Sequence, residues 1–244
     1  MADNKLDYIF GTDLEVFQGS KHFRFSLDSV LLANYVKLKP NIKVLDLGTG
    51  NGIIPLILAY REKAITIEGI EIQKSVVDLA KRNVSHNQLD NQINLLVDDL
   101  RNINKYFEHE SFDIVVSNPP YFSPKDGMTS MKEEYAYARH ELNGSISDFI
   151  EAASKMLKYR GSAYFIYNSN RLTEFCNILK LNNLEPKRLR FVHPKKDNNS
   201  NIFLLKATKG SKTGLIVEPS LTVYNNNTYS DELIRLVKGE SNEG

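Results

Sequence analysis

Four consecutive residues, Asn118-Pro119-Pro120-Tyr121, have the composition of a site for chemistry on nitrogen. They follow an apolar run at 112–117 that predicts a β-strand. Proline has no N–H and a fixed φ, so this segment cannot join a sheet and its carbonyl oxygens stay free. The Asn118 side-chain oxygen and the Pro119 carbonyl oxygen can both accept from one planar NH2 group, with Tyr121 as a flat face beside it. The segment predicts a site that presents an aromatic amine or an amide; the alternative is a Pro-Pro loop that only ends the strand.

A second candidate site is an apolar strand, 44–47, that runs into the alternating glycines Gly48, Gly50 and Gly52. Glycine permits positive φ and lets a ligand approach the backbone closely. The pattern is G-x-G-x-G rather than the G-x-G-x-x-G of dinucleotide sites, and it lacks the Lys-Ser/Thr ending of a phosphate loop. It therefore indicates a ligand other than a nucleoside triphosphate.

Acidic residues end the next two predicted strands. Glu71 ends the run 65–71, and an acid in that place can accept hydrogen bonds from both hydroxyls of a ribose. Asp98 and Asp99 follow the run 93–97, and either of them can accept from an adenine amino group. The glycines, these acids and the NPPY segment thus fall at the ends of successive strands, which ties them to one site.

Strand and helix patterns alternate along most of the chain, which predicts an α/β fold. Seven strands with crossovers predict a mostly parallel sheet whose last two strands form an antiparallel hairpin. Ser145 is the expected N-cap of the third of the four predicted helices. The predicted strands are 42–47, 65–71, 93–97, 112–117, 161–167, 187–193 and 201–207, and the predicted helices are 52–62, 73–87, 146–158 and 170–182.

Both ends of the chain carry additional elements. Residues 6–25 predict two short strands joined by a turn, and residues 225–244 predict a tail with a short amphipathic helix. Residues 122–144 form a long polar insertion, and such insertions in compact domains are usually functional or disordered. We expect an N-terminal hairpin and helix packed on the core, 1–41, and a main domain, 42–244.

The composition excludes several classes of protein. Hydrophobic residues make up 41% of the 244 positions, and the net charge of +1 does not by itself predict nucleic-acid binding. The single cysteine, Cys176, excludes a disulfide within the chain, and no His, Cys or Asp spacing indicates a metal site. The start is polar, and the longest apolar run, 53–59, is too short to span a membrane. We expect a cytoplasmic protein without a membrane or an obligate protein partner.

The strand-end residues resemble those of S-adenosylmethionine-dependent methyltransferases with the class I Rossmann-like fold, in the subgroup that methylates amino nitrogens. Further segments narrow the resemblance: FRFSLDSVLLA at 23–33, EIQ at 71–73 and ARHE at 138–141. With NPPYF at 118–122, they make the chain similar to the tRNA(Val) adenine-37 N6-methyltransferase family over nearly its whole length. The resemblance implies an enzyme that methylates N6 of an adenosine in tRNA, with adenosine 37 of tRNA(Val) as the expected target.

The resemblance also implies roles for individual residues. Asn118, Pro119 and Tyr121 match the target-amine site. Ser26 and Asp28 match a region near the methionine end of the cofactor, and both fit equally well as capping residues of a helix. The residues implied in binding S-adenosylmethionine are Ser26, Asp28, Asp46, Gly48, Gly50, Gly52, Glu71, Ile72, Asp98, Asp99, Leu100 and Asn118.

This chemistry requires positioning rather than covalent catalysis. The methyl group of a sulfonium is already activated, whereas a ring-attached amino nitrogen is a poor nucleophile because its lone pair is delocalised. Two acceptors on its two hydrogens favour a pyramidal nitrogen with its lone pair aimed at the methyl carbon. Proton loss can follow transfer, so no strong base is required. Methylation of cytosine C5 would need a nucleophilic cysteine, and Cys176 lies outside the strand-end cluster.

A base within RNA must be extruded before it can react. Aromatic side chains are expected to stack on it, and cations of the insertion and of the last hairpin to hold phosphates. A solvated run of charges is the alternative, and Glu133, Glu134 and Glu141 oppose a simple basic patch. The side chains predicted to contact RNA are Phe122, Lys125, Lys132, Arg139, His140 and Lys195.

Two other functions fit parts of the pattern. Glutamine-N5 methylation of a protein uses the same acceptors on a side-chain amide, but such enzymes usually carry a helical domain where this chain predicts a hairpin and one helix. A noncatalytic RNA-binding module can retain the fold, but it has no need of intact acceptors and cofactor acids. Both stay alternatives to the tRNA methyltransferase.

Overall fold

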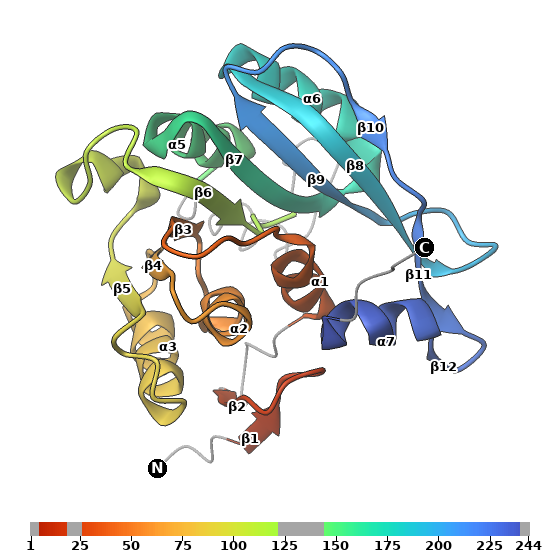
Figure 1. Ribbon diagram of the computed structural model, residues 1–244, viewed down its shortest axis with the longest axis horizontal. Helices are drawn as coiled ribbons and strands as arrows, with labels where there is room; N and C mark the ends of the chain where they lie inside the picture. The colour runs from red at the N-terminus through yellow and green to blue at the C-terminus, as the bar shows by residue number, and fades with distance from the viewer. Residues whose placement is uncertain (1–4, 19–25, 122–143, 240–244) are drawn as a thin grey trace, which may run out of the picture.

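A twisted sheet with helices on both faces dominates the computed structural model, which describes residues 5–18, 26–121 and 144–239 (Figure 1). The sheet has ten strands in the order β12-β11-β8-β9-β7-β6-β3-β4-β5, with β10 beside β8. Its seven principal strands are β3 (Lys43–Leu47), β4 (Thr66–Glu71), β5 (Ile93–Val97), β6 (Phe112–Ser117), β7 (Leu157–Asn168), β8 (Leu184–Lys195) and β9 (Ile202–Lys209).

The strand directions confirm the predicted mostly parallel sheet with an antiparallel last hairpin. β3 to β7 are parallel to one another, and β9 runs antiparallel to both β7 and β8. The prediction of seven strands missed the short strands beyond β8, two of which have only two residues and so carry no periodic signal. These are β10 (Ile216–Val217), β11 (Leu221–Asn225) and β12 (Thr228–Tyr229).

Apolar side chains from alternate positions of the strands build one core on each face of the sheet. On β7, Tyr164 and Ile166 belong to one core, and Phe165 and Tyr167 belong to the other. The first core is covered by α1 (Leu27–Tyr35), α2 (Ile53–Arg61), α3 (Lys74–His86) and α7 (Asp231–Lys238), and the second by η1 (Leu100–Lys105), α5 (Ile146–Met156) and α6 (Leu172–Leu181).

The N-terminal hairpin forms from β1 (Lys5–Tyr8) and β2 (Glu15–Gln18), which pair antiparallel. Its second strand, β2, is held by α3 rather than by the sheet. The fully buried Asn83 of α3 accepts a hydrogen bond from the Phe17 N–H at 2.8 Å and donates to the Phe17 carbonyl at 3.4 Å. The division of the chain after residue 41 stays a prediction.

The predicted helix caps and tail are also present. The Ser145 hydroxyl accepts from the Asp148 N–H at 3.3 Å, and the Asp148 carboxylate accepts from the Ser145 N–H at 2.7 Å, which is a capping box at the start of α5. The predicted tail helix is α7, which packs on α1. Nearly all of the insertion at 122–144 lies outside the described residues. No helix within the described ranges has both the length and the apolarity to cross a membrane.

Candidate active site

The glycine loop between β3 and α2 has the backbone conformation that the sequence predicts. Gly48, Gly50 and Gly52 have φ values of 73°, 56° and 86°, a region that favours glycine. The N–H of Gly48 donates to the Ile70 carbonyl at 2.9 Å, which fastens the loop to the end of β4. A Cβ atom at Gly48 would lie 3.1 Å from the Phe149 ring, so a side chain there would narrow the space between the loop and α5.

Glu71, the last residue of β4, is held in place by backbone groups on both sides. One carboxylate oxygen accepts from the Gly50 N–H at 3.3 Å, and the other accepts from the Gln73 N–H at 3.0 Å. Because both donors belong to the main chain, the carboxylate is fixed relative to the glycine loop. It lies on the wall of the pocket described below.

Asp46 lies beneath the same loop and is fully buried. Its Oδ2 accepts from the Thr49 hydroxyl at 2.7 Å, whereas its Oδ1 has no hydrogen-bond partner among the described residues. Burial raises the pKa of Asp46 to about 7, and the nearby charge of Glu71 acts in the same direction. A fully buried carboxylate oxygen without a hydrogen-bond partner is suited to a positively charged ligand above the glycine loop.

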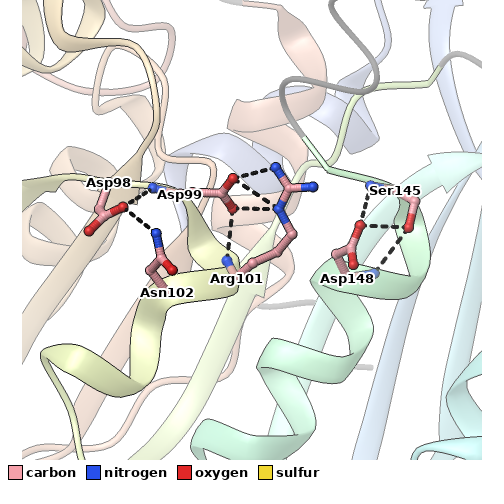
Figure 2. Close-up of polar contacts among 6 residues, drawn as sticks. All are labelled: Asp98, Asp99, Arg101, Asn102, Ser145 and Asp148. Carbon is pink, nitrogen blue, oxygen red and sulfur yellow. Dashed lines mark hydrogen bonds and ion pairs between the residues drawn. The ribbon is translucent and has the colours of Figure 1, made fainter.

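The two aspartates after β5 have different surroundings (Figure 2). Asp98 accepts from the Asp99 N–H at 2.6 Å, from the Asn102 amide at 2.9 Å and from the Tyr106 hydroxyl at 2.6 Å. These bonds, led by the one from Tyr106, lower the pKa of Asp98. All of them come from the turn that follows β5, so the structure uses the Asp98 side chain to shape that turn.

Asp99 is instead paired with a side chain that faces solvent. Its carboxylate accepts from the N–H and the Nε of Arg101, both at 2.9 Å, and these interactions lower the pKa of Asp99. The Arg101 side chain is 47% exposed and lies between Asp99 and the Ser145-Asp148 cap of α5 in Figure 2. Asp99 therefore caps η1 through the Arg101 N–H, and the exposed Arg101 guanidinium can move away from the carboxylate while that bond remains.

The NPPY segment is fastened from two sides. The Asn118 amide nitrogen donates to the Ser29 hydroxyl of α1 at 3.3 Å, so the Asn118 side-chain oxygen remains as an acceptor. The Tyr121 hydroxyl donates to Asp28 of α1 at 2.8 Å. Burial, followed by the charge of Asp28, raises the pKa of Tyr121, and burial also raises the pKa of Asp28.

The second set of contacts that hold the NPPY segment comes from β7. The Tyr121 ring packs edge-on against Tyr167 with 5.6 Å between centroids, and the Asn168 amide donates to the Tyr121 carbonyl at 3.4 Å. Ser29, Tyr167 and Asn168 were not anticipated as site residues. Their contacts with the segment span from 46 to 89 positions in the chain, so no local pattern could reveal them.

A pocket of about 230 Å³ lies where the ends of β3, β4, β5 and β6 meet. It brings together residues of every strand-end motif in the sequence, and it adds four that were not predicted: Ile70, Gln73, Pro120 and Phe149. Its predicted lining residues are Gly48, Glu71, Ile72, Asp98, Asp99, Leu100 and Asn118.

The other predicted site residues lie around this pocket or beyond the described ranges. Asp46, Gly50 and Gly52 form the glycine loop and its support, and Pro119 is buried beside Asn118. Ser26 occupies the N-cap position of α1 without a side-chain capping bond, and Asp28 binds Tyr121. Lys195 is exposed at the end of β8. Phe122, Lys125, Lys132, Arg139 and His140 lie outside the described residues.

The sequence profile of the methyltransferase small domain matches residues 8–182. The chain belongs to this methyltransferase family. Its fold agrees: a predicted O-methyltransferase from Agrobacterium tumefaciens, protein Atu636, superposes with a TM-score of 0.72 at 20% identity, over 88% of this chain and 97% of the other. The predicted class I methyltransferase fold and S-adenosylmethionine as the methyl donor are thereby confirmed.

Relatives in sequence carry a more specific name. A Bacteroides fragilis protein named tRNA1(Val) (adenine(37)-N6)-methyltransferase is 28% identical over 217 residues, which cover 86% of this chain and 87% of the relative. A Vibrio vulnificus protein of the same name is 27% identical over 211 residues, 86% of this chain and 85% of the relative. These matches agree with the narrower resemblance that the sequence motifs indicate.

Proposed function

We propose that this protein transfers a methyl group from S-adenosylmethionine to N6 of an adenosine in tRNA, with adenosine 37 of tRNA1(Val) as the target. The main support for the proposal is the position of Asn118 on the wall of the pocket. Its amide nitrogen donates to Ser29, its side-chain oxygen has no hydrogen-bond partner among the described residues, and it lines the same pocket as Glu71 and Asp99. The names of the two relatives supply the choice of tRNA and of position.

The residues around the pocket fit the cofactor. The Glu71 carboxylate, oriented by two main-chain donors, is suited to the hydroxyls of the ribose. Asp99 is suited to the adenine amino group once Arg101 moves aside, and we assign this role to Asp99 rather than Asp98 because the Asp98 side chain shapes its turn. The unpaired oxygen of Asp46 complements the positive charge of the bound molecule. S-adenosylmethionine, when bound, supplies an activated methyl group on a sulfonium.

The NPPY segment holds the amine that reacts. The Asn118 side-chain oxygen and the Pro119 carbonyl oxygen accept the two N6 hydrogens, which turns the nitrogen lone pair toward the methyl carbon. The N–C bond forms as the C–S bond breaks, and the nitrogen then loses a proton to solvent. Tyr121 provides the flat wall for the base, and its contacts to Asp28 and Tyr167 fix the orientation of that wall. Asp28 is therefore a positioning residue.

The first test is the fate of labelled methyl groups. Bulk tRNA is incubated with the protein and isotope-labelled S-adenosylmethionine, digested to nucleosides and analysed by mass spectrometry. We expect label in N6-methyladenosine with the wild-type protein, and label lower by roughly a hundredfold or more with Asn118→Ala. Label in protein glutamine would support the rival amide chemistry, and a failure to bind S-adenosylmethionine would support the noncatalytic RNA-binding module.

A further inference from the structure

A second and larger pocket, of about 380 Å³, lies between α1, α7 and the sheet strands β7, β8 and β9. It shares no lining residue with the pocket of Asn118. We call it the basic pocket. Its lining residues are Asn34, Tyr35, Lys37, Tyr164, Arg188, Arg190, Lys206, Glu218, Pro219, Glu232, Arg235 and Leu236.

Positive charge exceeds negative charge in the basic pocket. The two acids that line it each pair with one arginine, Glu218 with Arg188 and Glu232 with Arg190. The remaining three cations have no carboxylate partner among the residues that the structure describes: Lys37, Lys206 and Arg235. The walls of the pocket therefore carry an uncompensated positive charge.

Of the three cations without a carboxylate partner, Lys206 is the most enclosed. It lies directly across the ladder from Arg188, and its ammonium group is 5.7 Å from the centroid of the Tyr164 ring. Burial, followed by the charges of Arg188 and Lys39, lowers the pKa of Lys206. A half-buried ammonium among like charges is unfavourable in the free protein, and an anion in the pocket would relieve that repulsion.

A buried hydroxyl in the same pocket is poorly satisfied. Tyr35 is only 7% exposed, and its oxygen lies near Glu218 and Arg188 without a hydrogen bond of good geometry to any described residue. An unsatisfied buried hydroxyl is destabilising, by about 1–3 kcal/mol in typical cases. A ligand with hydrogen-bond acceptors would satisfy it, and an anionic oxygen would serve both this hydroxyl and the ammonium of Lys206.

The distance between the basic pocket and the active site indicates which anionic ligand fits the basic pocket. α1 joins the two sites, because Asp28 in its first turn binds Tyr121 and Tyr35 in its last turn lines the basic pocket. Seven residues of helix span ~10 Å, which corresponds to roughly three nucleotides of a stacked strand. Across the sheet, Lys206 lies two strands from Val116, which is also ~10 Å. A strand whose base enters the NPPY site can therefore reach this pocket with its backbone.

We propose that the basic pocket binds backbone phosphate groups of the RNA substrate. This inference rests on the proposed tRNA methyltransferase activity. The pocket holds the RNA backbone near the rigid helix that also positions Tyr121, so binding there sets the place of the target base. The exposed cations Lys37, Arg188 and Arg235 surround the better buried Lys206, an arrangement that lets a polymer enter from solvent.

The decisive variant is Lys37→Gln combined with Lys206→Gln, because it removes two cations without breaking an ion pair. Its matched control is Lys81→Gln combined with Lys180→Gln, two exposed lysines on α3 and α6. We expect the pocket variant to bind tRNA roughly tenfold more weakly or worse. We expect the plot of log affinity against log salt to become shallower by about two units. The control should retain the wild-type affinity and slope.

Two further measurements separate this inference from the proposed function. S-adenosylmethionine affinity should be unchanged in the pocket variant, since the basic pocket shares no lining residue with the pocket of Asn118. If the wild-type protein methylates no tRNA, the proposed function is wrong, whatever the affinity of the protein for tRNA. If methylation occurs and the pocket variant binds tRNA like the wild type, the phosphate site is wrong.

Tyr35→Phe and inorganic pyrophosphate complete the test. Tyr35→Phe should change thermal stability little and weaken tRNA binding severalfold, because the described neighbours of the hydroxyl, Glu218 and Arg188, are poorly aligned with it. Lower stability with unchanged tRNA affinity would count against a ligand contact at Tyr35.

Inorganic pyrophosphate tests the pocket in a second way, because it should compete with tRNA for the wild-type protein. Tight pyrophosphate binding without competition would assign the pocket to a small phosphorylated molecule and overturn the RNA assignment.

Discussion

At the scale of single residues, the site depends on side chains that have one group engaged and one group free. Asn118 uses its amide nitrogen on Ser29 and keeps its oxygen. Asp46 uses one oxygen on Thr49 and keeps the other. The engaged group fixes the rotamer, so the free group is already oriented before a ligand arrives, which is the preorganisation that methyl transfer requires.

Replacing Asn118 tests this view of the target-amine site. Asn118→Ala should lower turnover by roughly a hundredfold or more, comparable to the loss of one oriented hydrogen-bonding group in other enzymes. The affinity for S-adenosylmethionine should stay near that of the wild type, because the cofactor acids are untouched. Single-turnover methylation of tRNA and calorimetric titration of the cofactor measure the two effects. Turnover within a few-fold of wild type would remove Asn118 from the proposed mechanism.

Replacing Glu71 tests the cofactor side of the pocket. Glu71→Ala should weaken S-adenosylmethionine binding by about 2 kcal/mol, since charge-assisted hydrogen bonds to the ribose are lost. Calorimetry gives the change, with Glu151→Ala on the exposed surface of α5 as the control. An unchanged dissociation constant for the Glu71 variant would place the ribose elsewhere.

At the scale of elements, α1 connects the N-terminal part of the chain to the chemistry. Asp28 and Ser29 lie in its first turn and hold Tyr121 and Asn118, which follow β6. The sequence alone made Asp28 a candidate for the cofactor or for helix capping, and the structure shows it bonded to Tyr121. A direct contact between Asp28 and the cofactor stays a prediction.

A double-mutant cycle measures how strongly α1 supports the NPPY segment. Asp28→Ala and Tyr121→Phe each remove the same hydrogen bond, so their effects on kcat should be strongly non-additive. We expect a coupling energy of about 1–3 kcal/mol between the two positions, as is found for residues in contact. The kcat values of both single variants and the double variant give this number. Additive effects would mean that the bond does not orient the ring during catalysis.

At the scale of the whole molecule, the sheet explains how much of the site the sequence could predict. Apolar runs reveal strands, and acids or glycines after them reveal strand ends, so Gly48, Glu71 and Asn118 were assigned to one site before the fold was known. Their shared pocket follows because parallel strands present their carboxyl ends at one edge. Phe149 and the basic pocket could not be predicted, since they depend on how distant elements pack together.

The buried Asp46 gives the stability of the whole molecule a specific pH dependence. Its folded pKa of about 7 lies above the unfolded value of about 3.9. Between these values the folded state binds more protons, so this residue makes stability fall as pH rises from about 4 to about 7. In Asp46→Asn, urea denaturation should show a flatter dependence over that range. An identical pH profile in wild type and variant would mean that Asp46 is ionised in the folded protein throughout.

The way in which β2 is held sets an order of events during synthesis. An isolated hairpin is marginally stable in water, and this one relies on Asn83 and Asn87, which bond to Phe17 and Glu15 across 66 and 72 positions. At 5–20 residues per second, those asparagines are made roughly 4–14 s after the strand they hold. The N-terminal hairpin therefore lacks its partner while β3 and β4 are made, and a nascent chain cut before residue 83 should leave its N-terminal strands open to protease.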